Sequence, residues 1–157
     1  MKFNSISSEN SNMTKIDLSK SQSLERFMTA QNSCYEQVIG ELSIGKKTSH
    51  WIWYIFPQIA GLGFSEYSIY FGIHNLKEAK AYWSNELLRS RYEQCLQLII
   101  DSNKNPSDVL GEIDAKKLQS SITLFLEVDE NSEILNNALE ILYFGCRDER
   151  TLIALKG

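Results

Sequence analysis

The sequence Ser49-His50-Trp51-Ile52-Trp53-Tyr54-Ile55-Phe56-Pro57-Gln58 concentrates large aromatic side chains around a few polar ones. It holds two of the three tryptophans and one of the two histidines in the chain. Large aromatic residues bury much apolar area, so we expect most of this segment to be buried. Its polar members, Ser49, His50 and Gln58, indicate either the wall of a binding pocket or a core whose polar atoms are hydrogen-bonded.

Helical periodicity surrounds this segment on both sides. Hydrophobic residues recur at three- and four-residue steps from 24 to 42, and again in later stretches near 76–83, 88–101, 118–128 and 135–142. A short helix is expected within 65–73, and side chains suited to capping helix N-termini stand at Asn75, Asp114 and Asp148. The pattern predicts a mainly α fold: a compact multihelical single domain of about six to eight helices.

Composition limits the classes of protein to which the chain can belong. Its 157 residues suffice for one domain with its own core. A net charge of -4 argues against a nucleic-acid-coating surface, and the apolar runs are too short to cross a bilayer. Three scattered cysteines favour reduced thiols and a cytoplasmic location, and with two histidines they predict no metal site.

The N-terminal residues differ in composition from the rest of the chain. Residues 1–20 are rich in serine and asparagine, which predicts a disordered tail. Residues 21–157 are then expected to form the single helical domain, and Met13 is a candidate for the natural translation start. No cofactor is predicted, because Gly61 and Gly63 lack the strand–glycine loop–helix context of a dinucleotide site.

Gln31 lies on the apolar stripe of the first predicted helix. A polar side chain at such a position either pairs within the core or reaches into a cavity, so Gln31 is a candidate ligand contact. In the aromatic segment, His50 is a candidate proton shuttle, because histidine side chains commonly transfer protons in proteins, and Trp51 and Trp53 can stack on a ring or a cation. The alternative is that these aromatic residues belong to the core.

Lys117 precedes Ser120 and Ser121 by about one helical turn. Together they could hold a phosphate or carboxylate, or a buried lysine could activate a serine. The structural alternative is a solvated lysine beside small residues that let a neighbouring helix approach. Asp148, three residues before Thr151, suits an N-cap; a ligand at that helix start would also make Asp148 a candidate for proton transfer.

These motifs together resemble a known bacterial family. The matching residues are Arg26-Phe27, Gln31, the 49–58 segment, Gly61-Leu62-Gly63, Asp114, Lys117-Leu118, Ser120-Ser121, Thr123-Leu124-Phe125, Gly145, Asp148 and Thr151-Leu152. The chain resembles domain-of-unknown-function family 1810 over about residues 20–157. The resemblance implies a small, mostly helical cytosolic protein, and implies no activity.

Two hypotheses of function follow. The first is an enzyme or binder for a small polar ligand, such as a nucleotide or an ADP-ribose-like compound. In it His50 and Asp148 move a proton, and the ligand contacts are Gln31, Ser49, Trp51, Trp53, Gln58, Lys117, Ser120 and Ser121. The alternative is a non-catalytic helical protein-interaction module. The residues do not decide between catalysis and binding, nor do they fix the oligomeric state. We predict no nucleic-acid or membrane partner.

Overall fold

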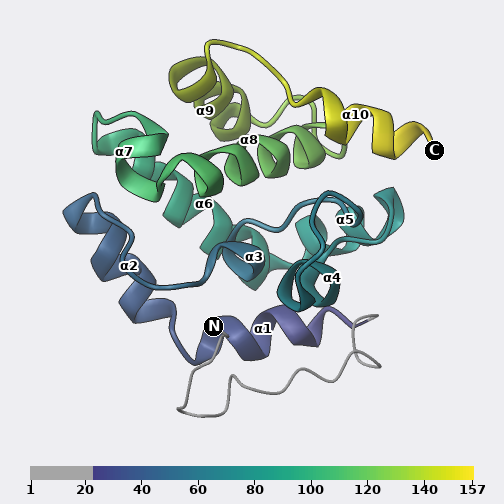
Figure 1. The fold of residues 1–157 in the computed structure, drawn as a ribbon, viewed down its shortest axis with the longest axis horizontal. Coiled ribbons are helices and arrows are strands. Elements are labelled where there is room, and N and C mark those ends of the chain that lie inside the picture. Colours follow the sequence, from purple (N-terminus) through teal and green to yellow (C-terminus); the bar gives the residue numbers. More distant parts are fainter. Residues whose placement is uncertain (1–22) are drawn as a thin grey trace.

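The computed structural model describes residues 23–157, which fold as ten helices with no strand in that range (Figure 1). The helices are α1 (Glu25–Asn32), α2 (Tyr35–Ile44), α3 (Ile52–Ile55), α4 (Glu66–Phe71), α5 (Leu76–Ser84), α6 (Glu86–Asp101), α7 (Pro106–Leu110), α8 (Glu112–Leu126), α9 (Glu133–Tyr143) and α10 (Glu149–Lys156). The predicted mainly α single domain is confirmed, with more helices than expected. The predicted tail, 1–20, and Met13 lie outside the described residues.

The first predicted helix, 24–42, is in fact two helices. The backbone leaves the helical region at Cys34, where φ is -144°, and α2 starts at the next residue. The apolar stripe continues across the break: Phe27 and Val38 are both fully buried. Periodicity therefore missed the break, because both halves direct their apolar side chains into the same core. The aromatic segment adds the four-residue helix α3, which also raises the number of helices.

Side-chain caps fix where several helices begin. Asn75 accepts a hydrogen bond from the backbone N–H of Glu78 at 2.9 Å, and Asp148 accepts one from Thr151 at 3.1 Å, as predicted. Asp114 does not cap a helix. Helix α8 begins at Glu112, which leaves Asp114 in its first turn with a carboxylate free to pair elsewhere.

Helix α8 is the centre of the fold. It packs against α3, α5, α7, α9 and α10, so side chains around most of its circumference are buried (Figure 1). Phe125 on α8 contacts the rings of Tyr82, Trp83 and Tyr92, with centroid separations of 5.0–5.3 Å. Of the residues described, none belongs to a helix long and apolar enough to cross a membrane.

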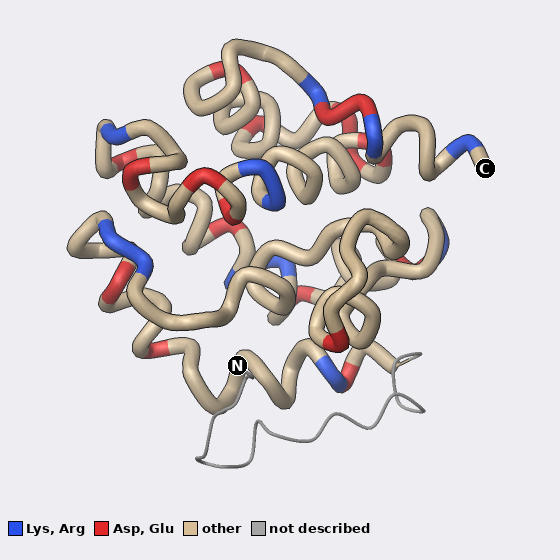
Figure 2. Tube along the Cα trace, viewed as in Figure 1, with Lys and Arg blue, Asp and Glu red and all other residues tan. Residues whose placement is uncertain are grey.

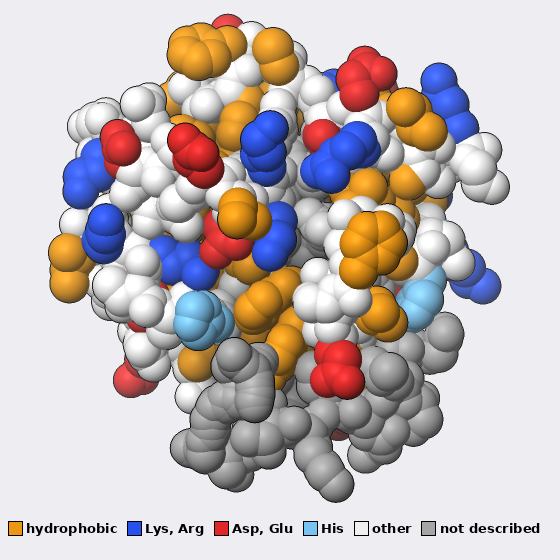
Figure 3. Space-filling view, in the orientation of Figure 1, with side chains coloured by type: hydrophobic (Ala, Val, Ile, Leu, Met, Phe, Trp, Pro, Cys, Tyr) orange, Lys and Arg blue, Asp and Glu red, His pale blue; other side chains and the backbone are white. Residues whose placement is uncertain are grey.

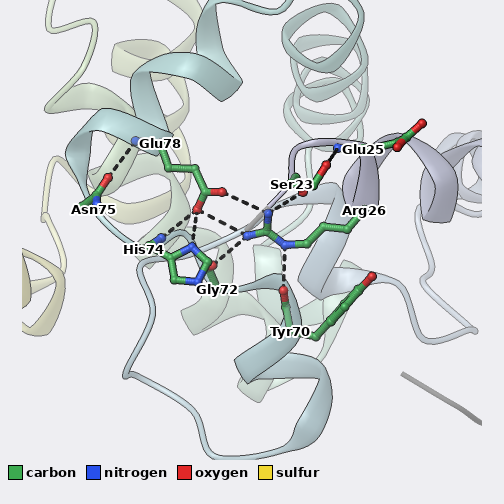
Figure 4. A network of polar contacts seen from close by, with 8 residues as sticks. All are labelled: Ser23, Glu25, Arg26, Tyr70, Gly72, His74, Asn75 and Glu78. Carbon is green, nitrogen blue, oxygen red and sulfur yellow. Dashed lines mark hydrogen bonds and ion pairs between the residues drawn. The ribbon is translucent and has the colours of Figure 1, made fainter. Parts of the chain in front are cut away.

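An ion pair buried between distant helices fixes α1 against α4 and α5 (Figure 4). The Arg26 guanidinium donates to the Glu78 carboxylate at 3.0 and 3.3 Å, and to the carbonyl oxygens of Tyr70, Gly72 and Ser23. The Arg26 side chain is fully buried. Burial alone would raise the pKa of Glu78, but hydrogen bonds from Arg26 and from His74 lower it.

Candidate functional site

The loop that leads from α2 into the aromatic segment is organised by Glu41. Its carboxylate accepts hydrogen bonds from the backbone N–H groups of Thr48 (2.8 Å) and Ser49 (3.2 Å), from the Ser49 hydroxyl, and from the Trp51 indole (2.9 Å). Burial by itself raises the pKa of Glu41, yet these donors outweigh it and lower the pKa to about 2. Glu41 was not predicted as a site residue, because in the sequence it looks like an ordinary glutamate near the end of a helix.

The Glu41 contacts define the environment of Ser49 and Trp51. The Ser49 hydroxyl donates to Glu41 and accepts from the Gln37 amide at 3.1 Å. Trp51 is 1% exposed, so both faces of its indole are covered. Ser49 and Trp51 therefore hold the loop between α2 and α3 in place through their hydrogen bonds to Glu41.

A cluster of two lysines and one carboxylate joins this loop to the start of α8. Asp114 Oδ2 lies 2.8 Å from Lys47 Nζ, and Asp114 Oδ1 lies 3.5 Å from Lys117 Nζ. The Lys47 backbone N–H donates to the Val109 carbonyl at 2.8 Å, which holds the loop beside α7. Figure 2 shows the lysines at 46–47 and at 116–117 as two blue stretches with the acidic start of α8 between them.

Each of these lysines also faces a tryptophan. Lys47 Nζ lies 5.1 Å from the Trp51 ring centroid, and Lys117 Nζ lies 5.2 Å from that of Trp53. A cation over an indole is attracted by the electrons of the ring. Lys117 of α8 thus lies against the aromatic segment at Trp53.

Trp53 is partly buried, with its indole between two helices. Tyr67 of α4 stacks on it with a centroid separation of 4.8 Å, while Lys117 of α8 faces the ring as well. The Trp53 indole N–H and Gln58 Oε1 are both buried, and neither has a hydrogen-bond partner among the described residues. Unpaired buried polar atoms are uncommon in folded proteins, so each needs a physical reason.

A second polar group joins α8 to the start of α10. Asp148 Oδ2 accepts from the Ser120 hydroxyl at 2.9 Å and from the Thr151 hydroxyl at 2.6 Å, besides capping α10. The Asp148 backbone N–H donates to Thr123 Oγ1 at 2.9 Å. Ser120 of α8 and Asp148 at the start of α10 are thus in direct contact, and this contact holds the two helices together.

Asp148→Ala is expected to lower the free energy of unfolding by about 2 kcal/mol, because it removes an N-cap, leaves the buried Thr151 hydroxyl without its acceptor and leaves Ser120 with only the Lys116 carbonyl at 3.1 Å. Urea unfolding monitored by circular dichroism measures this change. The exposed neighbour Glu149→Ala is the control, with an expected change below about 0.5 kcal/mol. An Asp148→Ala variant as stable as that control would contradict the contacts described.

Two other predicted contact residues lie in the interior. Gln31 is 1% exposed; its amide donates to the Tyr54 carbonyl at 2.7 Å and accepts from Arg91 at 3.3 Å. Ser121 is fully buried and shares a 2.8 Å hydrogen bond with the Tyr92 hydroxyl. The environment of Gln31 matches the paired-core alternative, and Ser121 lies against the neighbouring helix α6, as the structural alternative for that residue expects.

His50 has an exposed side chain, and its backbone carbonyl accepts from the Tyr54 hydroxyl at 3.4 Å.

The face that carries the lysine cluster is hollowed near its middle (Figure 3). Basic side chains border the hollow on one side and hydrophobic side chains on the other. In the same orientation, α8 and the start of α10 lie above this region, and the loop between α3 and α4 lies below it (Figure 1).

Comparisons with known proteins agree with this architecture. The family model described as "Protein of unknown function (DUF1810)" matches residues 21–155. The chain is also similar to the crystal structure of the conserved hypothetical protein Rv1873 from Mycobacterium tuberculosis. That match has 36% sequence identity and a TM-score of 0.80, and covers 85% of this chain and 96% of that one. Among proteins with curated descriptions, none matches this chain.

Proposed function

Because the chain belongs to the DUF1810 family of proteins of unknown function, we propose a function from its own geometry: it binds a small ligand with an anionic group, such as a nucleotide. The ligand lies on the hollowed face beside Lys117 and Trp53. The observation that carries the proposal is the unpaired, buried Trp53 indole N–H, on the same ring that Lys117 faces.

The charge of the lysine cluster supports this proposal. Two lysines share the single carboxylate of Asp114, so the three side chains together carry one excess positive charge. Lys47 lies nearer that carboxylate than Lys117 does, at 2.8 Å against 3.5 Å, which leaves Lys117 the less neutralised cation. Its side chain is only 24% exposed, and an anion is attracted more strongly to a charge that water screens poorly.

The two unpaired atoms support it as well. A buried donor or acceptor without a partner costs about 1–3 kcal/mol, and a ligand that supplies the partner recovers this energy. The Trp53 N–H requires an acceptor, which an anionic ligand carries, and Gln58 Oε1 requires a donor. Both atoms are covered in this structure, so binding includes a local movement that uncovers them.

The other predicted residues take different parts in this proposal. Ser49 and Trp51 position the loop through Glu41, and Ser120 and Asp148 position α10 against α8. The proposal is one of binding and assigns no proton transfer, because Asp148 Oδ2 already accepts three hydrogen bonds.

Lys117→Gln is expected to weaken ligand binding at least about tenfold, because it removes the cation that faces the anion. Thermal unfolding of the wild type with ADP, ADP-ribose, pyrophosphate and the ribonucleoside monophosphates identifies a stabilising ligand, and calorimetric titration then gives its affinity. Lys116→Gln is the matched control: it removes the same charge from the next residue, whose side chain is exposed, and we expect less than a threefold change.

Equal affinity in the two variants would contradict the site. If no anionic ligand stabilised the wild type, the proposed function would fail and the interaction-module hypothesis would take precedence. Its candidate surface would then be the exposed apolar side chains on and after α9, Ile141 (56% exposed) and Phe144 (84% exposed).

A further inference from the structure

We propose that Phe64 is the residue on which a planar ring of the ligand stacks, so that the site selects ring-bearing anions over simple phosphates. This inference rests on the proposed function and assigns the ring contact to a residue outside the family motifs described above. The choice of Phe64 depends on which aromatic side chains near the hollow have a ring face that is not already covered.

The tryptophans of the aromatic segment offer little free surface. Trp51 is 1% exposed and donates to Glu41. The Trp53 indole is stacked on Tyr67 and is also faced by the Lys117 ammonium group. A ligand ring on Trp53 would have to displace one of these two contacts. The sequence hypothesis that Trp51 or Trp53 stacks on a ring is therefore disfavoured by their packing.

Phe64 differs from both tryptophans because its side chain is 90% exposed, the highest value among the large hydrophobic residues that stand exposed on the described part of the chain. Leaving an aromatic side chain in water forgoes roughly 1.5–3 kcal/mol of burial energy. A stacked base would recover part of this energy, since base–aromatic stacking is worth about 1–3 kcal/mol.

The loop that carries Phe64 has a constrained backbone. Gly61 has φ +100°, a conformation that favours glycine, and a Cβ at Gly63 would lie 2.6 Å from Ser68 Oγ. The ends of the segment are tied together: Ala60 N–H donates to the Ile73 carbonyl at 2.8 Å, and Ile73 N–H donates to the Gln58 carbonyl at 2.9 Å. The loop thus leaves and re-enters the fold at one point beside Gln58.

This anchoring couples Phe64 to the atoms of the proposed site. Gln58, whose Oε1 is unpaired, forms the base of the loop, and Tyr67, which stacks on Trp53, follows it in α4. The hollow seen in Figure 3 has basic side chains on one border and hydrophobic side chains on the other, and Figure 1 shows the loop between α3 and α4 passing below α8 in the same orientation. A ligand whose anionic group lies at Lys117 would therefore extend towards the loop between α3 and α4, which carries Phe64.

The test compares ligands that differ only by the ring. Affinities of the ribonucleoside 5′-monophosphates and of ribose 5-phosphate are measured by calorimetric titration against wild type, Phe64→Ala, Phe64→Trp and Phe144→Ala. We expect the best nucleotide to bind wild type at least about fivefold more tightly than ribose 5-phosphate, the low end of base–aromatic stacking. Phe64→Ala removes this preference and leaves ribose 5-phosphate unchanged, whereas Phe64→Trp and Phe144→Ala retain it.

The outcomes separate the inference from the proposed function. If ribose 5-phosphate binds but no nucleotide binds more tightly, the anion site stands and the role of Phe64 is wrong. The same conclusion follows if Phe64→Ala keeps the preference, or weakens both kinds of ligand equally. If neither ribose 5-phosphate nor any nucleotide binds to wild type, the proposed function fails and this inference fails with it.

Discussion

Arg26→Ala is expected to lower the free energy of unfolding by about 3–5 kcal/mol, the range seen when one member of a buried ion pair is removed. The Arg26 side chain is fully buried and supplies every hydrogen bond that joins α1 to the carbonyls of Tyr70 and Gly72 shown in Figure 4. Its removal leaves the Glu78 carboxylate, 13% exposed, without its cation. Urea unfolding at neutral pH measures the loss.

Two further variants make this prediction specific. Arg26→Lys keeps the charge but not the planar guanidinium that reaches Glu78 and three carbonyl groups together, so it is expected to recover only part of the stability. Arg150→Ala, whose side chain is 58% exposed, is the control and should cost less than about 0.5 kcal/mol. A loss for Arg26→Ala no larger than that of the control would show that the network is not formed.

Glu41→Gln is expected to destabilise the protein by about 3 kcal/mol at pH 7, because the lowered pKa of about 2 reflects donors that prefer the ionised carboxylate. The folded-state pKa lies below the ordinary value of 4.5, so this stabilisation is complete above pH 4.5 and is lost as the pH falls towards 2. The difference between wild type and Glu41→Gln should therefore be smaller at pH 3 than at pH 7, by about 2 kcal/mol.

Urea unfolding at the two pH values measures this difference. Glu36→Gln is the matched control, because Glu36 is an exposed glutamate on the same helix, and its effect should be small at both pH values. A Glu41→Gln effect that does not change between pH 7 and pH 3 would contradict the arrangement of donors around Glu41.

Local signals in the sequence predicted much of the fold. Asn75 and Asp148 are recognisable caps, since each accepts from the backbone N–H three residues later. The stripe through Leu118, Ile122 and Phe125 identified α8, and all three residues are fully buried. The motif positions Lys117 and Trp53 do meet in space.

The residues that sequence reasoning missed are held by partners distant in the chain. Arg26 stands out in the sequence only as part of the family resemblance, and its pairing with Glu78, 52 positions away, has no local signal in the sequence. Glu41 stands at the end of an amphipathic helix, where glutamate is ordinary, and it acquires its role only when the following loop folds back onto it. Long-range pairing of charged groups leaves no periodic trace in a sequence.

The aromatic segment also contains a difference that the sequence does not reveal. Trp51 and Trp53 are two residues apart and look equivalent in the sequence, yet one indole N–H donates to Glu41 and the other has no partner in the described structure. The third tryptophan, Trp83, donates to Asp129 at 3.1 Å. Of the three indole N–H groups, two donate to carboxylates and that of Trp53 has no partner in the described structure. The NMR signal of the Trp53 N–H therefore reports on the proposed site separately from the other two.

The most direct test is to follow the three indole N–H resonances in a proton–nitrogen correlation spectrum while ADP is added. Conservative tryptophan-to-phenylalanine variants assign the signals. We expect the Trp53 signal to shift as its N–H gains an acceptor, while those of Trp51 and Trp83 remain nearly fixed. A Trp53 signal that stays in place at saturating ADP, or that moves no more than the other two, would contradict an anion site at Trp53 and Lys117.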